Sequence, residues 1–199
     1  MVVNYLWNNE LSETLYHSLG ALETVLRNSI HATLAREFGR GDWYDLPGVL
    51  TVKQPGQVSE VKDRITRDNK PILPGRVIAG LDFGFWTTLL SRGYRRLWTP
   101  SNHRLVQQTF PYAPSNMQTR PAVFDRINEA RFLRNRVFHY ECIADDPRLR
   151  EKHANVIGVI GWISPQVQTS VQFFDRFDNV YTNGRRRIEH DLKRHLRVP

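Results

Sequence analysis

Apolar residues recur every three or four positions along the first part of the chain, a spacing that predicts one long amphipathic helix. Asn9 or Ser12 is expected to cap the start of this helix, and Gly39 with Gly41 is expected to end it. The repeating apolar positions are Leu11, Leu15, Leu19, Leu22, Leu26, Ile30, Leu34 and Phe38.

Proline and glycine punctuate the next stretch, which predicts loops joined by short helices. Residues 43–56 predict a loop, 58–67 a short polar helix, and 71–75 a break. The aromatic-rich run that follows predicts a buried helix ending at Gly93, with its rings in the core rather than in a base-stacking platform. Residues 101–110 predict one more short helix. We therefore expect a loop-rich helical insertion at 43–121.

Helical spacing returns near Thr119 or Arg120, where Pro121 suits an early helical position. A further helix is expected between Pro147 and Ser164, and another begins at Pro165. The last helix is expected over 185–196, after a break at Asn183-Gly184. The helix that begins at Pro165 should bury Val167, Val171, Phe174 and Phe177. No run alternates long enough for a sheet. The pattern predicts an all-α bundle in one domain, residues 1–199, with a basic C-terminal helix at 184–199.

Charge narrows the choice of partner. The 199 residues carry 28 Lys and Arg against 20 Asp and Glu, a formal net charge of +8, and lysine occurs only five times. Arginine presents a planar fork of donors that suits phosphate, so the bias favours an RNA or DNA partner, although a GC-rich genome also raises arginine content. The chain has no apolar run long enough for a membrane span and no signal-peptide pattern, so we expect a cytoplasmic protein with no membrane partner.

Several kinds of chemistry find no support in the residue pattern. Cys142 is the single cysteine, which excludes an internal disulfide and a multi-cysteine metal site. The seven histidines include no His-x-x-x-His pair. No phosphate-binding glycine loop and no Gly-x-Ser-x-Gly motif occurs. We expect neither a metal nor a cofactor.

Residues 131–141 concentrate the candidate chemistry. On a helical wheel, Arg134 falls at the centre of the apolar face formed by Val123, Ile127, Ala130, Val137 and Phe138. An arginine in that place needs a buried anion, a carboxylate partner or a subunit interface.

The histidine five residues later changes what Arg134 can do. His139 would point about 140° away from Arg134 on a continuous helix, so either the helix ends before His139 or His139 works with groups from elsewhere. The loss of helical pattern from Tyr140 to Pro147 favours an end at Phe138. Arginine, the amide of Asn135 and histidine make a plausible metal-free phosphodiester site. The histidine would move a proton on or off a ribose hydroxyl, and the arginine would stabilise charge on the phosphorane.

The segment Arg134-Asn135-x-x-x-His139 resembles the Arg-x-x-x-x-His motif of HEPN-superfamily ribonucleases. The chain from about residue 5 to 165 is similar to the Abi-like (abortive infection) branch of that superfamily. The supporting residues are Glu23-x-x-Leu26-Arg27-Asn28, Phe38-Gly39, Asp42-Trp43-Tyr44, Phe83-Gly84-Phe85-Trp86, Leu90, Tyr94 and Leu97-Trp98.

This resemblance implies a HEPN-like helical bundle and a metal-independent RNA endonuclease, toxin-like, that serves antiphage defence as a homodimer with the two motifs facing each other. Arg134, Asn135 and His139 match the catalytic positions. Tyr140 departs from the many relatives that carry a second histidine there, and residues 166–199 lie outside the match. No antitoxin or phage trigger can be inferred from the sequence.

Each candidate residue also has a structural explanation. Arg134 could bind Glu23 or Glu129, His139 could end the helix in a core hydrogen bond, and Asn135 could be a plain surface amide. Glu23 and Arg27 either form an ion pair one turn apart or position Arg134. His31, one turn after Arg27, could reach the same site.

The basic tail has two readings as well, and so does the whole protein. A solvated helix face competes with an RNA-phosphate contact through Arg185, Arg186, Arg187, Lys193 and Arg194. A non-catalytic RNA-binding or dimerisation module of the same fold is the alternative function.

Overall fold

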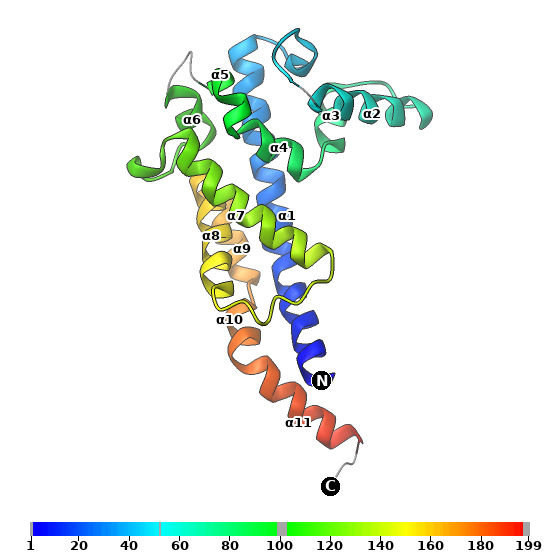
Figure 1. The fold of residues 1–199 in the computed structure, drawn as a ribbon, viewed down its shortest axis with the longest axis vertical. Helices are drawn as coiled ribbons and strands as arrows, with labels where there is room; N and C mark the ends of the chain where they lie inside the picture. The colour runs from blue at the N-terminus through cyan, green and yellow to red at the C-terminus, as the bar shows by residue number, and fades with distance from the viewer. Residues whose placement is uncertain (1, 52, 99–102, 197–199) are drawn as a thin grey trace. The chain divides into compact units, whose positions relative to one another are not determined.

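The computed structural model describes residues 2–51, 53–98 and 103–196, and its regular elements in these ranges are all helices, with no strand (Figure 1). The all-α prediction is therefore confirmed. The described residues divide into two compact units. One contains residues 2–22 and 129–196, and the other contains residues 23–128.

The longest element is α1 (Val2–Phe38). Its leucine and isoleucine stripe from Leu11 to Leu34 is buried throughout, as its spacing predicts. It ends where expected, because Gly39 adopts a left-handed φ of 67° and the Arg40 N–H donates to the Ala35 carbonyl at 3.0 Å.

The predicted start of α1 is wrong, because the helix already includes Val2, so Asn9 and Ser12 lie inside it. Tertiary contacts give the reason. The Asn8 side chain is buried, and its Oδ1 accepts from the Ile143 N–H at 2.7 Å and the Ala144 N–H at 3.1 Å. These bonds hold the N-terminal turns of α1 against the segment that follows α7.

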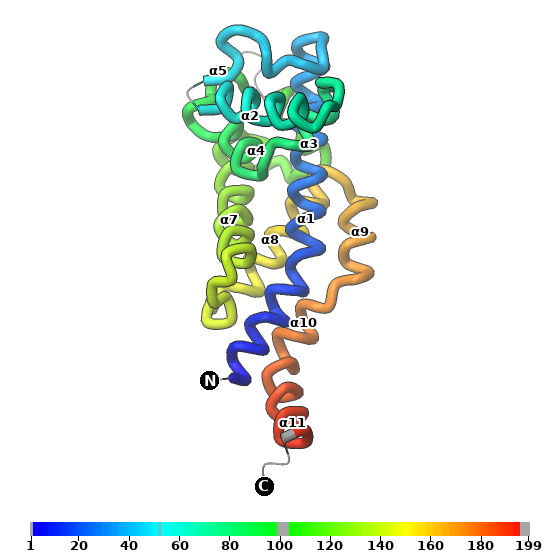
Figure 2. Tube along the Cα trace, turned by 90° about the vertical axis from the view of Figure 1, so that its right-hand side faces the viewer, coloured from blue at the N-terminus to red at the C-terminus, as the bar shows by residue number. Residues whose placement is uncertain are grey.

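In the unit of residues 2–22 and 129–196, five further helices follow, the last two joined by a π turn (Figure 2). They are the end of α7 (Arg120–Phe138), α8 (Leu149–Ile163), α9 (Pro165–Phe174) and α10 (Phe177–Asn179), which leads through a π turn (Val180–Gly184) into α11 (Arg185–Leu196). Helices α8 and α9 pack against each other. Val171 and Phe177 are buried as predicted, but Phe174, at the end of α9, is 67% exposed.

The predicted break at Asn183-Gly184 is also wrong, because the chain stays helical through the π turn into α11. Gly184 is buried, and a Cβ added there would lie 3.1 Å from Cδ1 of Trp7. The glycine therefore permits close packing against α1 instead of ending a helix.

The unit of residues 23–128 holds the loop-rich segment. Its elements are 3₁₀ turns at Trp43–Asp45, Arg92–Tyr94 and Ser115–Met117, with α2 (Gln54–Arg67), α3 (Pro74–Gly80), α4 (Phe83–Leu89), α5 (Arg95–Trp98) and α6 (His103–Thr109). Trp43, Phe85, Trp86 and Phe110 are fully buried, so the aromatic block is core as expected. The helix predicted to end at Gly93 instead ends at Leu89, whose carbonyl accepts from the Trp98 indole at 2.6 Å as the chain turns back.

Candidate functional site

The candidate motif lies at the C-terminal end of α7, which begins at Arg120 and ends at Phe138, as the sequence predicts. The His139 N–H still donates to the Asn135 carbonyl at 2.9 Å. The Tyr140 N–H then donates to Val137 and the Glu141 N–H to Arg136, which is the bond pattern of a Schellman ending. His139 is therefore the C-terminal cap of α7, and Tyr140 takes the left-handed position with a φ of 58°.

The helical wheel placed Arg134 at the centre of the buried face of α7, and this prediction is wrong. The face is centred on Ala130, and Arg134 lies about 40° away from that centre and is half-buried. Phe138, placed on the same face by the wheel, is 41% exposed. The buried residues of this helix are Val123, Ile127, Ala130, Leu133 and Val137. Leu133 shifts the face, so Arg134 lies at its margin.

Aromatic rings hold the Arg134 guanidinium at that margin. Its Cζ lies 4.4 Å from the centroid of the Phe138 ring, and that ring meets Tyr16 of α1 edge-on, with centroids 5.2 Å apart. Stacking of this kind is worth about 0.5–1 kcal/mol at a partly exposed site. The Nε atom of Arg134 is buried. The guanidinium is thus oriented between the core and solvent.

The other two motif residues are more accessible. Asn135 is half-buried and His139 is exposed. Because His139 still follows the helical path, its side chain leaves the helix about 140° from that of Arg134. The geometry of a single chain therefore does not direct Arg134 and His139 toward one point.

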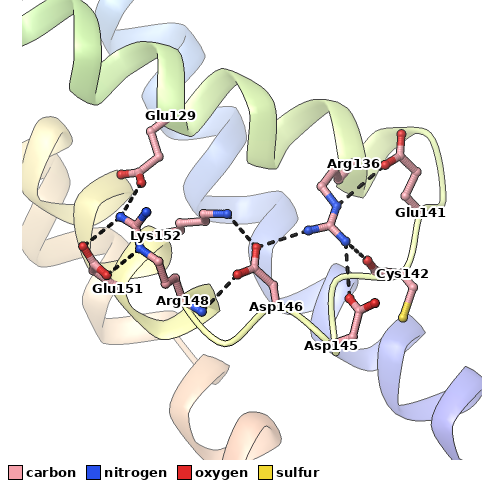
Figure 3. A network of polar contacts seen from close by, with 9 residues as sticks. All are labelled: Glu129, Arg136, Glu141, Cys142, Asp145, Asp146, Arg148, Glu151 and Lys152. Atoms are coloured by element: carbon pink, nitrogen blue, oxygen red, sulfur yellow. Dashed lines mark hydrogen bonds and ion pairs between the residues drawn. The ribbon is translucent and has the colours of Figure 1, made fainter.

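Arg136, which the sequence analysis did not single out, organises the loop that follows the motif (Figure 3). Its guanidinium lies 3.1 Å from Asp146, 3.3 Å from Asp145 and 3.6 Å from Glu141, and it also donates to the Cys142 carbonyl. The sequence did contain a signal for this contact, because two adjacent acids, Asp145 and Asp146, follow Arg136 after nine and ten residues across a short loop. This contact closes the loop back onto the last turn of α7.

Asp146 is the centre of this network. Its side chain is only 8% exposed, and it accepts from Lys152 at 2.6 Å and from the Arg148 N–H at 3.0 Å. Burial alone raises the pKa of Asp146, but these hydrogen bonds and the charges of Lys152 and Arg136 outweigh it, so its pKa lies below the ordinary value. Asp146 stays ionised and ties the loop to both α7 and α8.

The residues expected to surround Arg134 have other roles or lie elsewhere. Glu129 pairs with Arg148 at 3.0 Å. Glu23 and Arg27 belong to the other compact unit, so their expected contact with Arg134 stays a prediction. In that unit the Arg27 Nε donates to Asn28 at 3.3 Å. His31 accepts from the Trp43 indole at 3.1 Å, and burial lowers the pKa of His31.

The basic tail forms α11, whose cations are all exposed. Arg185 donates from Nε to Asn4 at 3.1 Å, and Arg187 pairs with Glu10, so two of the three consecutive arginines contact α1. Lys193 pairs with Glu189 at 3.1 Å. Arg186 and Arg194 have no carboxylate partner among the described residues.

Within the described ranges, no group of three His, Cys, Asp or Glu side chains is placed to hold a metal ion. None of the helices described is both long and apolar enough to cross a bilayer. The chain matches no family model, no curated protein and no solved structure in the comparisons we made.

Proposed function

We propose that this chain is a HEPN-like, metal-independent endoribonuclease of the Abi-like kind, a toxin-like enzyme of antiphage defence that acts in the cytoplasm on RNA. The observation that supports this most is the placement of Arg134, Asn135 and His139 in the last turn and C-cap of a single helix. His139 is open to solvent, and Arg134 is oriented by Phe138.

His139 suits proton transfer in this scheme because its imidazole is exposed to solvent, and histidine is the side chain that most often transfers protons in enzymes. It would take the proton from a ribose 2′-hydroxyl, whose oxygen then attacks the adjacent phosphorus and expels the 5′-oxygen of the next nucleotide. Arg134 would stabilise the negative charge that builds up on the phosphorane, and Asn135 would orient a phosphate oxygen through its amide.

The divergence of Arg134 and His139 within one chain favours a homodimer. Exposed aromatic side chains surround the motif: Phe132 is 56% exposed, Phe138 41% and Tyr140 85%. On the helical path of α7, Phe138 lies on the side that carries Arg134, and Phe132 lies on the side that carries His139. Exposed apolar side chains of this size are typical of interaction surfaces. A two-fold pairing over the C-terminal end of α7 would cover them and bring the two motifs together in one cleft.

Two further sets of residues belong to the proposal. Glu23 and Arg27 would position Arg134. Arg185, Arg186, Arg187, Lys193 and Arg194 would contact RNA phosphates, with Arg186 and Arg194 best placed because no described carboxylate pairs with them.

Replacing the histidine tests the proposal. His139→Ala, incubated with total RNA in EDTA, should lose cleavage by about a hundredfold or more, the usual contribution of a general acid or base. His190→Ala is the matched control, because His190 is an exposed histidine of α11 whose Nδ1 lies 3.4 Å from Asp191. His139→Ala cleaving at the wild-type rate would remove His139 from the reaction.

A second pair of variants tests the arginine. Arg131 and Arg134 lie one turn apart on α7, and each guanidinium packs over a phenylalanine ring, at 4.7 Å and 4.4 Å. Arg134→Ala should abolish cleavage, whereas Arg131→Ala should not. If the wild-type protein binds RNA but never cuts it, the alternative of a non-catalytic RNA-binding or dimerisation module is correct.

A further inference from the structure

A pocket of about 340 Å³ lies beside the start of α11, and five of its six lining residues lie outside the segment that the HEPN resemblance covers. This volume is at the lower end of the range for small-molecule sites, which is about 300–1,000 Å³. Its walls come from α1, the π turn and α11, all within one compact unit. The lining residues are Trp7, Tyr181, Thr182, Arg185, Arg186 and Glu189.

One wall of the pocket is aromatic and held in place. The Trp7 indole donates to the Val180 carbonyl at 2.9 Å, and its ring lies 6.4 Å from that of Tyr181. Tyr181 stacks on the buried Phe177 at 5.5 Å, and the Arg150 guanidinium lies 4.9 Å from the centre of its ring. Trp7 is half-buried and held by this hydrogen bond, so its ring gives the pocket a rigid flat surface. Binding a ligand on this surface would cost little side-chain entropy, because the ring is already ordered.

The lining also includes two arginines. Arg185 is anchored through its Nε to Asn4, an arrangement that fixes the guanidinium at the pocket. Arg186 has no carboxylate partner among the residues described. The one acid, Glu189, is paired with Lys193 at 3.1 Å, so its charge is largely balanced. The pocket is therefore net positive.

We infer that this pocket binds a nucleotide unit, with the base packed on Trp7 and the phosphate held by Arg185 and Arg186. Aromatic stacking combined with arginine donors is the usual recognition of single-stranded nucleic acid. A second pocket in the same unit suits phosphate less well, because Glu10 and Glu13 line it together with Arg176 and Arg187, so it carries no net positive charge. Identifying the nucleotide as part of an RNA strand rests on the proposed function, whereas the chemistry of the pocket does not.

The test measures binding to the full-length protein rather than cleavage. A fluorescent single-stranded RNA with 2′-O-methyl groups cannot be cut by attack of its 2′-hydroxyls, and 5′-AMP serves as the single-nucleotide competitor. Trp7→Leu should weaken binding of the strand about tenfold, the typical loss of one stacked base, whereas Trp7→Phe should retain most of the affinity. Arg186→Ala, at an exposed position that does not endanger folding, should weaken binding and lower the salt slope by about 0.7.

Arg176→Ala is the matched control for Arg186→Ala. It removes the same charge from an exposed position of the same compact unit, outside the pocket and outside the residues proposed to contact RNA. Arg186→Ala should weaken 5′-AMP competition and Arg176→Ala should not. Competition by 5′-AMP identifies a free nucleotide as a sufficient ligand, whereas binding of the strand alone identifies the strand as the source.

Equal effects of Arg186→Ala and Arg176→Ala, together with unchanged binding by folded Trp7→Leu, would overturn the pocket and leave only a general attraction between a basic protein and RNA. Cleavage of RNA in EDTA that persists in that case leaves the proposed function standing. If the pocket substitutions weaken binding as expected but the wild-type protein never cuts RNA, the pocket is supported and the proposed function is refuted.

Discussion

Replacing Asp146 by asparagine should destabilise the protein by about 2 kcal/mol. The two cations nearest its Oδ2 are Lys152 at 2.6 Å and Arg136 at 3.1 Å, and an asparagine there loses the charge and can present an N–H₂ donor to both. A hydrogen bond to a charged group contributes about 1.5–3 kcal/mol. Two such bonds are lost, but Arg136 keeps its other acceptors and Lys152 is still 23% exposed to water, which reduces the sum.

The matched control is Asp145→Asn, one residue earlier on the same loop. Asp145 contacts the same guanidinium at 3.3 Å, but its side chain is 70% exposed. Exposed pairs of this kind contribute about 0–1 kcal/mol, so we expect at most about 0.5 kcal/mol here. In thermal unfolding at pH 7, Asp146→Asn should lower the midpoint by about 4–8 °C, and Asp145→Asn by about 2 °C or less.

Acid provides a second readout of the same group. The pKa of Asp146 is lower in the folded state, so its stabilisation is complete above the unfolded value near 4 and is lost as the pH falls through the folded value. The stability difference between wild type and Asp146→Asn should therefore narrow below about pH 4. Equal losses for the two variants at pH 7, or a difference that does not narrow in acid, would refute this reasoning.

Three further outcomes follow from the structure. Tyr140→Gly should raise the free energy of unfolding by about 1 kcal/mol in urea titrations, because the tyrosine is 85% exposed and occupies a left-handed φ of 58° that costs an L-residue energy; an unchanged midpoint would contradict it. Burial lowers the pKa of His153, which stacks on Phe177 at 4.1 Å. The free energy of unfolding should therefore decrease as the pH falls below about 6.5, because the unfolded chain binds the proton more readily than the folded one. His153→Phe should make this decrease smaller. Sedimentation of the wild type should give twice the chain mass of 23.3 kDa. Phe132→Glu should yield monomers that cut RNA poorly, whereas Phe173→Glu, at another exposed phenylalanine, should remain dimeric and active. A wild-type monomer that cuts RNA would refute the dimer.

The sequence by itself determined which segments are helical where the signals are local. The leucine stripe of α1 and its end at Gly39 follow from spacing and from a residue that tolerates a positive φ. The bounds of α7 follow equally from Pro121 near its start and from the loss of helical pattern after Phe138. The candidate motif could be found for the same reason, because its residues are close together in the chain.

Only the tertiary structure decided how those helices use their residues. The start of α1 depends on Asn8 binding backbone groups more than a hundred residues away, and Gly184 serves packing against Trp7. The margin position of Arg134 depends on Leu133 being the residue that the core accepts. The role of Arg136 depends on where the loop carrying Asp146 returns. The local pattern does not distinguish which of several similar side chains is buried or forms an ion pair. Contacts between distant segments decide this, because burial and pairing are properties of the packed chain.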